Sequence, residues 1–415
     1  MNTSRISETS SVAQTESPEV CRRIRLSWTT LLLLMTVLPA ISRAQTQQQV
    51  RPRGSDPVPE PAVSAVLAAF DKYEVVGMPE AHDLKDVDDF ILSLIRNPAF
   101  AEKVNDIAVE CGNSLYQPVL DRYIAGEDVP FKEVQKVWRN TTQMMCGWSG
   151  FFEQFFPVVR AINQERPLGK RLRVLAGDPP VDWDQVKDYD DRWKFGDREA
   201  SIASVMEKEV LSKHRKALML FGTFHLFHGQ EKSAVSIYER DYPNLTFVIS
   251  ELGFFDTDLP TLSISPFAIW PIPSLARAKG TWLGALDLGH FLPNPMSIDE
   301  DCNVHKVEFP KSLQKPMEYL VDALLYLGPQ DLRLREQLPA DIALDIDYRM
   351  ELQRREALPG LPGVAPEALL WDREWNGEIV NRASSPLFVV PKPDTGIKGI
   401  VQSCLDRKNG SSAPQ

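Results

Sequence analysis

The chain contains little cysteine and lacks the motifs that identify several common classes of site. Five of its 415 residues are cysteine. No CxxC pair and no cysteine–histidine spacing of a structural zinc site is present. The sequence also has no GxSxG nucleophile elbow and no GxGxxG or GxxxxGK[ST] phosphate loop. It therefore gives no support for a serine hydrolase or a nucleotide-binding protein.

A strongly basic surface is also missing. The formal net charge is −11, and the basic cluster that stands out is Lys213–Lys216. It lies at the end of a predicted helix, where cations interact favourably with the helix dipole. We therefore expect no nucleic-acid partner, and a small-molecule or peptide substrate instead.

The amino-terminal region has the features of an export signal. Arg22, Arg23 and Arg25 precede an uncharged apolar stretch, residues 26–41, which is shorter than a typical membrane span. Small residues around Ala44 then form a cleavage site. We predict a signal peptide over residues 1–44 and an exported mature protein, periplasmic or secreted, with no membrane attachment after cleavage.

Export would leave four cysteines in an oxidising compartment. Cys111, Cys146, Cys302 and Cys404 are too few for a disulfide scaffold of this length. One bridge is possible, and the spacing does not assign its partners.

Four short apolar runs each lead into a polar residue suited to catalysis. They cover residues 73–77, 106–110, 172–177 and 217–222, and each has the length and flanking turn residues of a buried strand. Helical patterns lie between them. This alternation predicts an α/β fold with a mostly parallel central sheet flanked by helices.

In such sheets, ligands bind beyond the carboxyl ends of the strands. We therefore expect the polar residues that follow the runs to converge on one crevice: Glu80, His82, Glu110, Asp178 and His225. A structural interpretation stands beside each of them. Asp178 can cap the turn that follows it, for example, and a single histidine after a strand is often only a hydrogen-bonded structural residue.

Two imidazoles and several carboxylates permit three kinds of chemistry. His82, Glu110 and His225 match the ligand set of a catalytic metal site with one position left for water. One histidine could instead act as a general base on water without a metal. In the third case the histidines would bind haem iron.

The rest of the chain divides into a predicted disordered leader at 45–61, a domain at 62–358 and a loosely attached tail at 359–415. Two aromatic-rich helices at 131–145 and 151–165 are consistent with a helical wall or lid over the strand ends, although core packing is the favoured interpretation. Further helices are predicted at 63–70, 85–96, 114–124, 197–213 and 340–358, and further strands at 245–249 and 319–327.

The order of these motifs resembles the superfamily of erythromycin esterases, ChaN-like haem-binding proteins and Tiki/TraB-type metalloproteases. Gly222–His225 matches its late Gly-x-x-His element, and Val109–Glu110 matches its strand ending in Glu. The first element is altered, because two residues separate Gly77 from Glu80 where the family has glycine and glutamate adjacent. The segments 175–183 and 322–329 are similar to an uncharacterised exported branch of the group. The resemblance covers roughly residues 70–330.

The resemblance implies an α/β domain with a deep cleft at which His82 is the general base or first metal ligand, completed by Glu110 and His225. Its members differ in chemistry: histidine-activated water opens a lactone, a divalent metal such as zinc or manganese assists hydrolysis, or haem is bound. The leading hypothesis is an exported hydrolase acting on an ester, lactone or amide bond. The alternative is a periplasmic haem- or metal-binding protein without catalysis. Fold alone does not choose between them.

Overall fold

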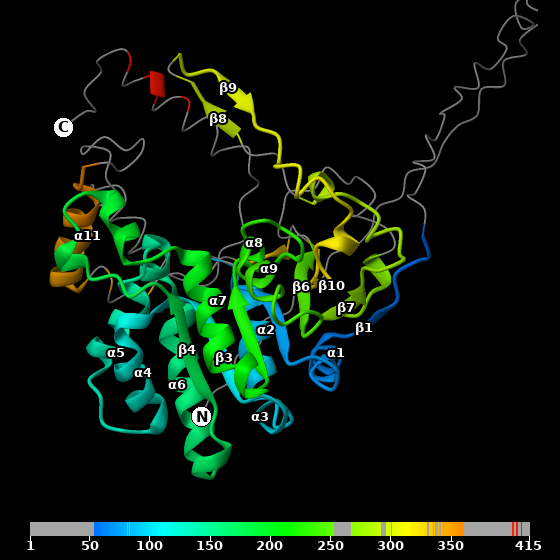
Figure 1. Ribbon diagram of the computed structural model, residues 1–415, viewed down its shortest axis with the longest axis horizontal. Helices are drawn as coiled ribbons and strands as arrows, with labels where there is room; N and C mark the ends of the chain where they lie inside the picture. Colours follow the sequence, from blue (N-terminus) through cyan, green and yellow to red (C-terminus); the bar gives the residue numbers. More distant parts are fainter. Residues whose placement is uncertain are drawn as a thin grey trace, which may run out of the picture. The chain divides into compact units, whose positions relative to one another are not determined.

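The protein has an eight-stranded, mostly parallel sheet with helices on both faces, as a computed structural model of the chain shows (Figure 1). The structure describes residues 54–359 except 81, 83, 253–266, 292–295, 300, 330–331, 335, 337–338, 340–341 and 343, and it also describes residues 401, 404, 405 and 408. The α/β class predicted from the four apolar runs is confirmed.

The strand order is β1-β7-β10-β6-β2-β5-β3-β4. The six strands from β10 to β4 in this order pair in parallel. At the other edge of the sheet, β7 pairs antiparallel with β10 and with β1. Their bounds are β1 Pro59–Pro61, β2 Val75–Pro79, β3 Asp106–Asn113, β4 Arg173–Asp178, β5 Ala217–Phe221, β6 Thr246–Leu252, β7 Ser274–Arg277 and β10 Ala323–Tyr326. A separate two-stranded hairpin pairs β8 (Met296–Ile298) with β9 (Val304–Lys306).

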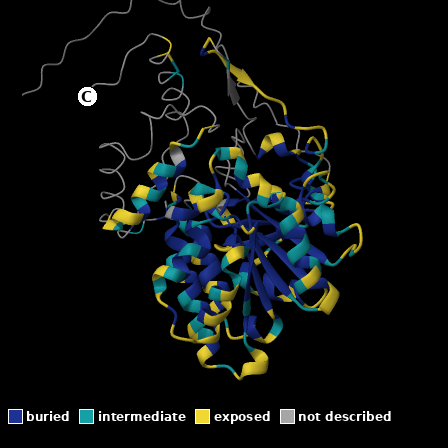
Figure 2. Ribbon diagram, turned by 60° about the vertical axis from the view of Figure 1, so that its left-hand side comes forward, coloured by how far each residue is buried: buried dark blue, intermediate teal, exposed yellow. Residues whose placement is uncertain are grey.

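Successive residues of the central strands point to opposite faces of the sheet, and both faces are buried (Figure 2). Val76 and Leu218 belong to the core on one face, whereas their neighbours Val75 and Ala217 belong to the core on the other. A sheet covered on both faces needs strands that are apolar throughout, which is why these runs do not alternate with polar residues.

The helices that contribute to the first core are α1 (Ala62–Ala69), α2 (Lys85–Arg96), α3 (Phe100–Lys103), α4 (Gln117–Ala125), α5 (Phe131–Arg139) and α6 (Gly150–Gln164). The second core includes residues of α7 (Arg198–Glu209), α8 (Thr223–Leu226) and α9 (Ala234–Tyr238). Helix α11 spans Ile346–Glu356. None of the helices among the described residues combines the length and the apolar character of a membrane span.

The aromatic side chains of α5 and α6 lie in the core and do not line the polar site. Trp138, Phe151, Phe152, Phe155 and Phe156 are fully buried and contact one another. Core packing, the favoured interpretation of this segment, accounts for them. The predicted helix at 131–145 ends earlier, at Arg139, and a 3-10 turn, η3 (Met144–Trp148), follows it.

One predicted boundary differs from the structure, and the predicted tail is bonded to the domain. The end of the predicted disordered leader is ordered, because Pro59–Pro61 forms β1 and pairs with β7. Within the predicted loose tail, Cys404 forms a disulfide with Cys302, so the tail is covalently attached to the domain. Most of that tail, like the predicted signal peptide at 1–44, lies outside the described residues.

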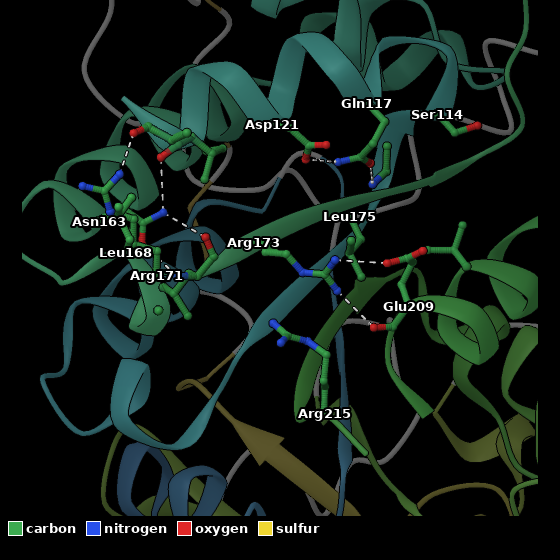
Figure 3. Close-up of a pocket in the computed structure, with 16 residues that line it drawn as sticks. Ser114, Gln117, Asp121, Asn163, Leu168, Arg171, Arg173, Leu175, Glu209 and Arg215 are labelled. Atoms are coloured by element: carbon green, nitrogen blue, oxygen red, sulfur yellow. Dashed lines mark hydrogen bonds and ion pairs between the residues drawn. The ribbon is translucent and has the colours of Figure 1, made fainter. Parts of the chain in front are cut away.

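The free edge of β4 borders a cavity of about 600 Å³ between α4 and α7 (Figure 3). Gln117 and Asn163 place side-chain amides along this edge: Gln117 Nε2 donates to Val174 O and its Oε1 accepts from Ala176 N, both at 2.8 Å. None of the five predicted site residues lines this cavity.

Candidate active site

All five predicted site residues lie at or just beyond the carboxyl ends of four neighbouring parallel strands. Glu80 and His82 follow β2, and Glu110 lies within β3. Asp178 is the last residue of β4, and His225 lies in α8, which begins two residues after β5. The pairing of β2 with β5, of β5 with β3 and of β3 with β4 brings these ends together.

Glu110 is at the centre of the site. Its Oε1 accepts a hydrogen bond from Arg198 Nη2 at 2.6 Å, and its Oε2 accepts one from the Gly222 backbone N–H. A Cβ at position 222 would lie 3.1 Å from Glu110 Oε2, so glycine allows this close approach. Burial alone would raise the pKa of Glu110, but Arg198 and His225 hold it well below its usual range. Glu110 is therefore a permanent anion.

Strand β3 is irregular at this position. Its register with β4 shifts between Val109 and Asn113. The strand also continues three residues past Glu110, whereas the sequence predicted that it would end at Glu110. Irregularities of this kind redirect side chains next to functional sites.

His82 lies between two carboxylates. Its Nδ1 is 3.3 Å from Glu80 Oε2, and its Nε2 is 3.6 Å from Glu110 Oε1. Burial disfavours the imidazolium, but the charges of Glu80 and Glu110 outweigh that effect and raise the pKa of His82 to about 11. Glu80 is buried, whereas 27% of the His82 side chain is exposed. The imidazole is therefore the more exposed member of this pair.

His225 lies on the other side of Glu110. Its Nε2 is 3.6 Å from Glu110 Oε1, and its Nδ1 is 2.5 Å from Glu199 Oε1. Burial opposes the charge on this ring as well, but Glu110 and Glu199 raise the pKa of His225 to about 9. The five side chains form an alternating chain of acid and imidazole: Glu80, His82, Glu110, His225 and Glu199.

Asp178 holds the site to the segment that precedes η3. It accepts hydrogen bonds from the backbone N–H and the hydroxyl of Thr142, both at 2.6 Å, and its Oδ1 is 3.2 Å from Arg198 Nε. Burial raises the pKa of Asp178 to about 6, even though Arg198 and Thr142 favour its ionised form. The described contacts of Asp178 are thus to Thr142 and Arg198, and not to His82, Glu110 or His225, which we expected it to orient. It acts on Glu110 only through Arg198.

Sequence reasoning missed Arg198 and Glu199. They are the first two residues of α7, which the side chain of Asp197 caps by accepting a hydrogen bond from Ala200 N at 2.9 Å. The helix was predicted, but its first turn was not considered as part of the site. The order of elements could have indicated these residues. In a parallel sheet, the helix that follows β4 begins at the edge where the strands end, so its first residues lie near the site.

Another buried acid lies near the carboxyl end of β6, the strand next to β2. Glu251 belongs to β6, and the predicted strand ended two residues too early to include it. Glu251 is ion-paired with Arg333, yet burial raises its pKa to about 7.

A disulfide closes the site beside β3. Cys111 directly follows Glu110 and is bonded to Cys146 of η3, with their Cα atoms 5.4 Å apart. The one bridge considered possible is thus accompanied by a second, Cys302–Cys404.

Glu80, His82 and Glu110 could hold a metal ion by spacing, because their ligand atoms lie within 4.8 Å of one another. The predicted set of His82, Glu110 and His225 differs from this group in one member. In both sets the Glu110 oxygen already binds the guanidinium of Arg198, and a divalent cation there would face that positive charge. Donor geometry therefore permits a metal, whereas the local charge opposes it.

The Glu110 carboxylate also opposes the binding of haem iron between the two histidines. Both histidines direct Nε2 towards Glu110 Oε1. An iron held axially by the two imidazoles would have to occupy the position of a buried, arginine-bound carboxylate. The residues present do not fit that group.

No protein-family model matches the chain, and no curated protein matches it. One similar solved structure is a Bacillus cereus protein, which is 11% identical, with a TM-score of 0.42 over 69% of this chain and 96% of the other. Another is described as a succinoglycan biosynthesis protein, which is 8% identical, with a TM-score of 0.44 over 66% of this chain and 94% of the other. Both similarities are too distant to transfer a function, so the candidate activity depends on the acid–imidazole chain itself.

Proposed function

We propose that the protein is a hydrolase in which Glu80 and His82 act as an acid–base pair that adds water to an ester, lactone or amide bond. The observation that carries this proposal is the position of His82, partly exposed between the carboxylates of Glu80 and Glu110. The buried Glu80 Oε2 accepts no hydrogen bond from the described residues. Its partner is the imidazole of His82, whose Nδ1 lies 3.3 Å away.

The pKa of His82 modifies the role expected for it. With a pKa of about 11, His82 is an imidazolium at neutral pH, so it is a proton donor in the resting site. Glu80 is then the group that takes a proton from water, while His82 stabilises the oxyanion and protonates the leaving group. Water adds to the carbonyl carbon to give a tetrahedral oxyanion, and the bond to the leaving group breaks as this intermediate collapses. The proton taken by Glu80 then returns to the neutral imidazole of His82.

Glu110 and its partners keep this pair charged and in place. Arg198 and the Gly222 N–H fix the Glu110 carboxylate, which in turn attracts the proton on His82. His225, held by Glu199, provides a second cation at the same edge and could contact the substrate carbonyl from the other side.

The same contacts favour hydrolysis over the alternative of a haem- or metal-binding carrier, since Arg198 already neutralises the central acid. Export remains part of the proposal. The two disulfides support it, because stable disulfides are typical of oxidising compartments.

The test is a steady-state assay of purified full chain on a panel of aryl esters, lactones and anilides. We expect Glu80→Gln and His82→Gln each to lower kcat about 10²–10⁴-fold, the usual contribution of a positioned acid or base. Activity should stay high through neutral pH, fall in part as His225 loses its proton near pH 9, and fall further as His82 loses its proton near pH 11.

His305→Asn serves as the matched control, because His305 also pairs with a carboxylate, Asp299 at 2.6 Å, but lies exposed on the β8–β9 hairpin. No turnover on the whole panel, or full activity in both site variants, would contradict the proposal. A rate that instead rises with pH up to 11 would return His82 to the role of general base.

A further inference from the structure

The disulfide next to Glu110 lies against the same imidazole that the proposed reaction uses. A ring nitrogen of His82 and the sulfur atoms of Cys111 and Cys146 all lie within 4.8 Å of one another. Both cysteines are fully buried, whereas the imidazole is partly exposed. A histidine and two sulfurs this close are three ligands of the kind that zinc prefers.

We propose that reduction of the Cys111–Cys146 disulfide creates a zinc site formed by His82, Cys111 and Cys146. A dithiol or phosphine reductant supplies two electrons, and the S–S bond is replaced by two thiols. Zinc then displaces one proton from each thiol and any second proton from the imidazole. The disulfide and the zinc site are therefore mutually exclusive states of the same three residues.

The geometry permits this exchange without a large backbone movement. Zinc–sulfur bonds of about 2.3 Å at a tetrahedral ion place two sulfurs roughly 3.8 Å apart. The Cα atoms of Cys111 and Cys146 are 5.4 Å apart, so rotation of the two side chains can open this gap.

Charge also distinguishes this set from the carboxylate set around Glu110. Two thiolates and one zinc ion are neutral together, and none of the three residues is ion-paired with Arg198. Glu80 lies 3.3 Å from His82 Nδ1 and would help to fix the orientation of the imidazole. Carboxylate–histidine–zinc arrangements of this type are common around bound zinc.

Zinc on His82 would occupy the nitrogen that the proposed reaction needs. The oxidised protein would then be the hydrolase, and the reduced, zinc-loaded protein would be inactive. This consequence rests on the proposed function, whereas zinc binding itself does not and can be measured without a substrate.

The binding experiment uses the full chain with Cys302→Ser and Cys404→Ser, which removes the second disulfide and leaves the site intact. The protein is reduced with a water-soluble phosphine, which becomes the phosphine oxide with oxygen from water. Zinc is then titrated against a chromogenic chelator. We expect one tightly held zinc per reduced chain and none in the oxidised chain. Cobalt in place of zinc should give a near-ultraviolet thiolate charge-transfer band.

The matched variant adds Cys111→Ser and Cys146→Ser, and it should lose the tight zinc and the cobalt band. Thermal unfolding of the reduced chain with and without zinc provides a second readout, since a ligand bound to the folded state raises Tm. The proposal is overturned if the reduced chain holds no more zinc than this variant, or if zinc leaves its Tm unchanged. Zinc binding without any hydrolytic activity would contradict only the proposed function.

Discussion

Arg198 takes the part in this site that a metal ion often takes in hydrolases. Its guanidinium contacts both Glu110 and Asp178, and it keeps a buried carboxylate ionised between two imidazoles. A buried charge of this kind is costly unless it is paired and hydrogen-bonded. The arginine therefore explains how Glu110 can stay an anion and can hold protons on His82 and His225.

Glu199 gives a residue-scale prediction. Glu199→Gln removes the charge beside His225 Nδ1, so the pKa of His225 should fall from about 9 towards its ordinary value near 6.5. The imidazole C–H resonances in a nuclear magnetic resonance titration report this pKa. We also expect kcat at neutral pH to fall about tenfold, because His225 would lose both its orientation and part of its charge.

The control is Glu239→Gln. Glu239 Oε2 lies 3.0 Å from Nδ1 of His228, in a cluster whose described contacts include neither Glu110 nor His82. It should shift the pKa of His228 and leave turnover unchanged. An His225 pKa that stays near 9 in Glu199→Gln would remove Glu199 from the site.

At the scale of elements, β4 is the last strand of the sheet, and side chains cover the edge at which it has no neighbouring strand. Edge strands present unpaired backbone groups that can pair with other molecules. Gln117 hydrogen-bonds to Val174 O and Ala176 N. Asn163, labelled in Figure 3, hydrogen-bonds to both backbone groups of Leu172 at 2.8 Å. The two amides replace the neighbouring strand that β4 lacks.

Gln117→Ala should therefore destabilise the fold and expose the edge. Leaving two backbone groups without these partners is expected to lower the free energy of unfolding by about 1–3 kcal/mol. Denaturant unfolding measures this loss, and light scattering should show concentration-dependent association.

Gln314→Ala is the control that tests whether association requires loss of an amide at the β4 edge. The Gln314 amide also donates to a backbone carbonyl, Phe309 O at 2.7 Å, but neither residue belongs to a strand. We expect some loss of stability without association. Equal association of the two variants would show that β4 is not the exposed pairing edge.

Elements were more predictable than their ends. The apolar runs, the cap at Asp197 and the amphipathic pattern of α2 are local, so the sequence indicates these strands and helices directly. The extension of β3 past Glu110 and of β6 to Glu251 depends on pairing with neighbouring strands. Pairing is tertiary, so these ends were misplaced, and Glu251 was missed with them.

At the scale of the whole molecule, His228 joins segments that are distant in sequence. Its two ring nitrogens contact Glu239 and Asp322, each at 3.0 Å, and Asp322 also accepts a hydrogen bond from Val248 N. Burial disfavours the charged ring, but the two carboxylates raise the pKa of His228 to about 9. The imidazolium therefore links α9 to the start of β10.

This link makes stability depend on pH. The folded pKa of about 9 exceeds the ordinary value of 6.5, so the stabilisation is fully present below pH 6.5 and is lost as the pH rises through 9. His228→Gln should lower the free energy of unfolding at pH 6 by up to about 3 kcal/mol. The difference from the unchanged protein should shrink towards pH 10.

Denaturant unfolding at pH 6, 8 and 10 measures this effect, with the exposed His305→Asn as control. A deficit that is the same at all three pH values would indicate lost packing in place of a lost ion pair.

The sequence by itself determined which segments form strands and helices, and it placed five polar residues at strand ends, because hydrophobic periodicity and turn residues act over short stretches of chain. The strand order, the meeting of Arg198 and Glu199 with Glu110, and the pairing of Cys111 with Cys146 were decided only by the tertiary structure. All three depend on which strands become neighbours and on where helix α7 begins relative to the sheet. Such contacts join residues that are far apart in the chain, and local sequence patterns do not encode them.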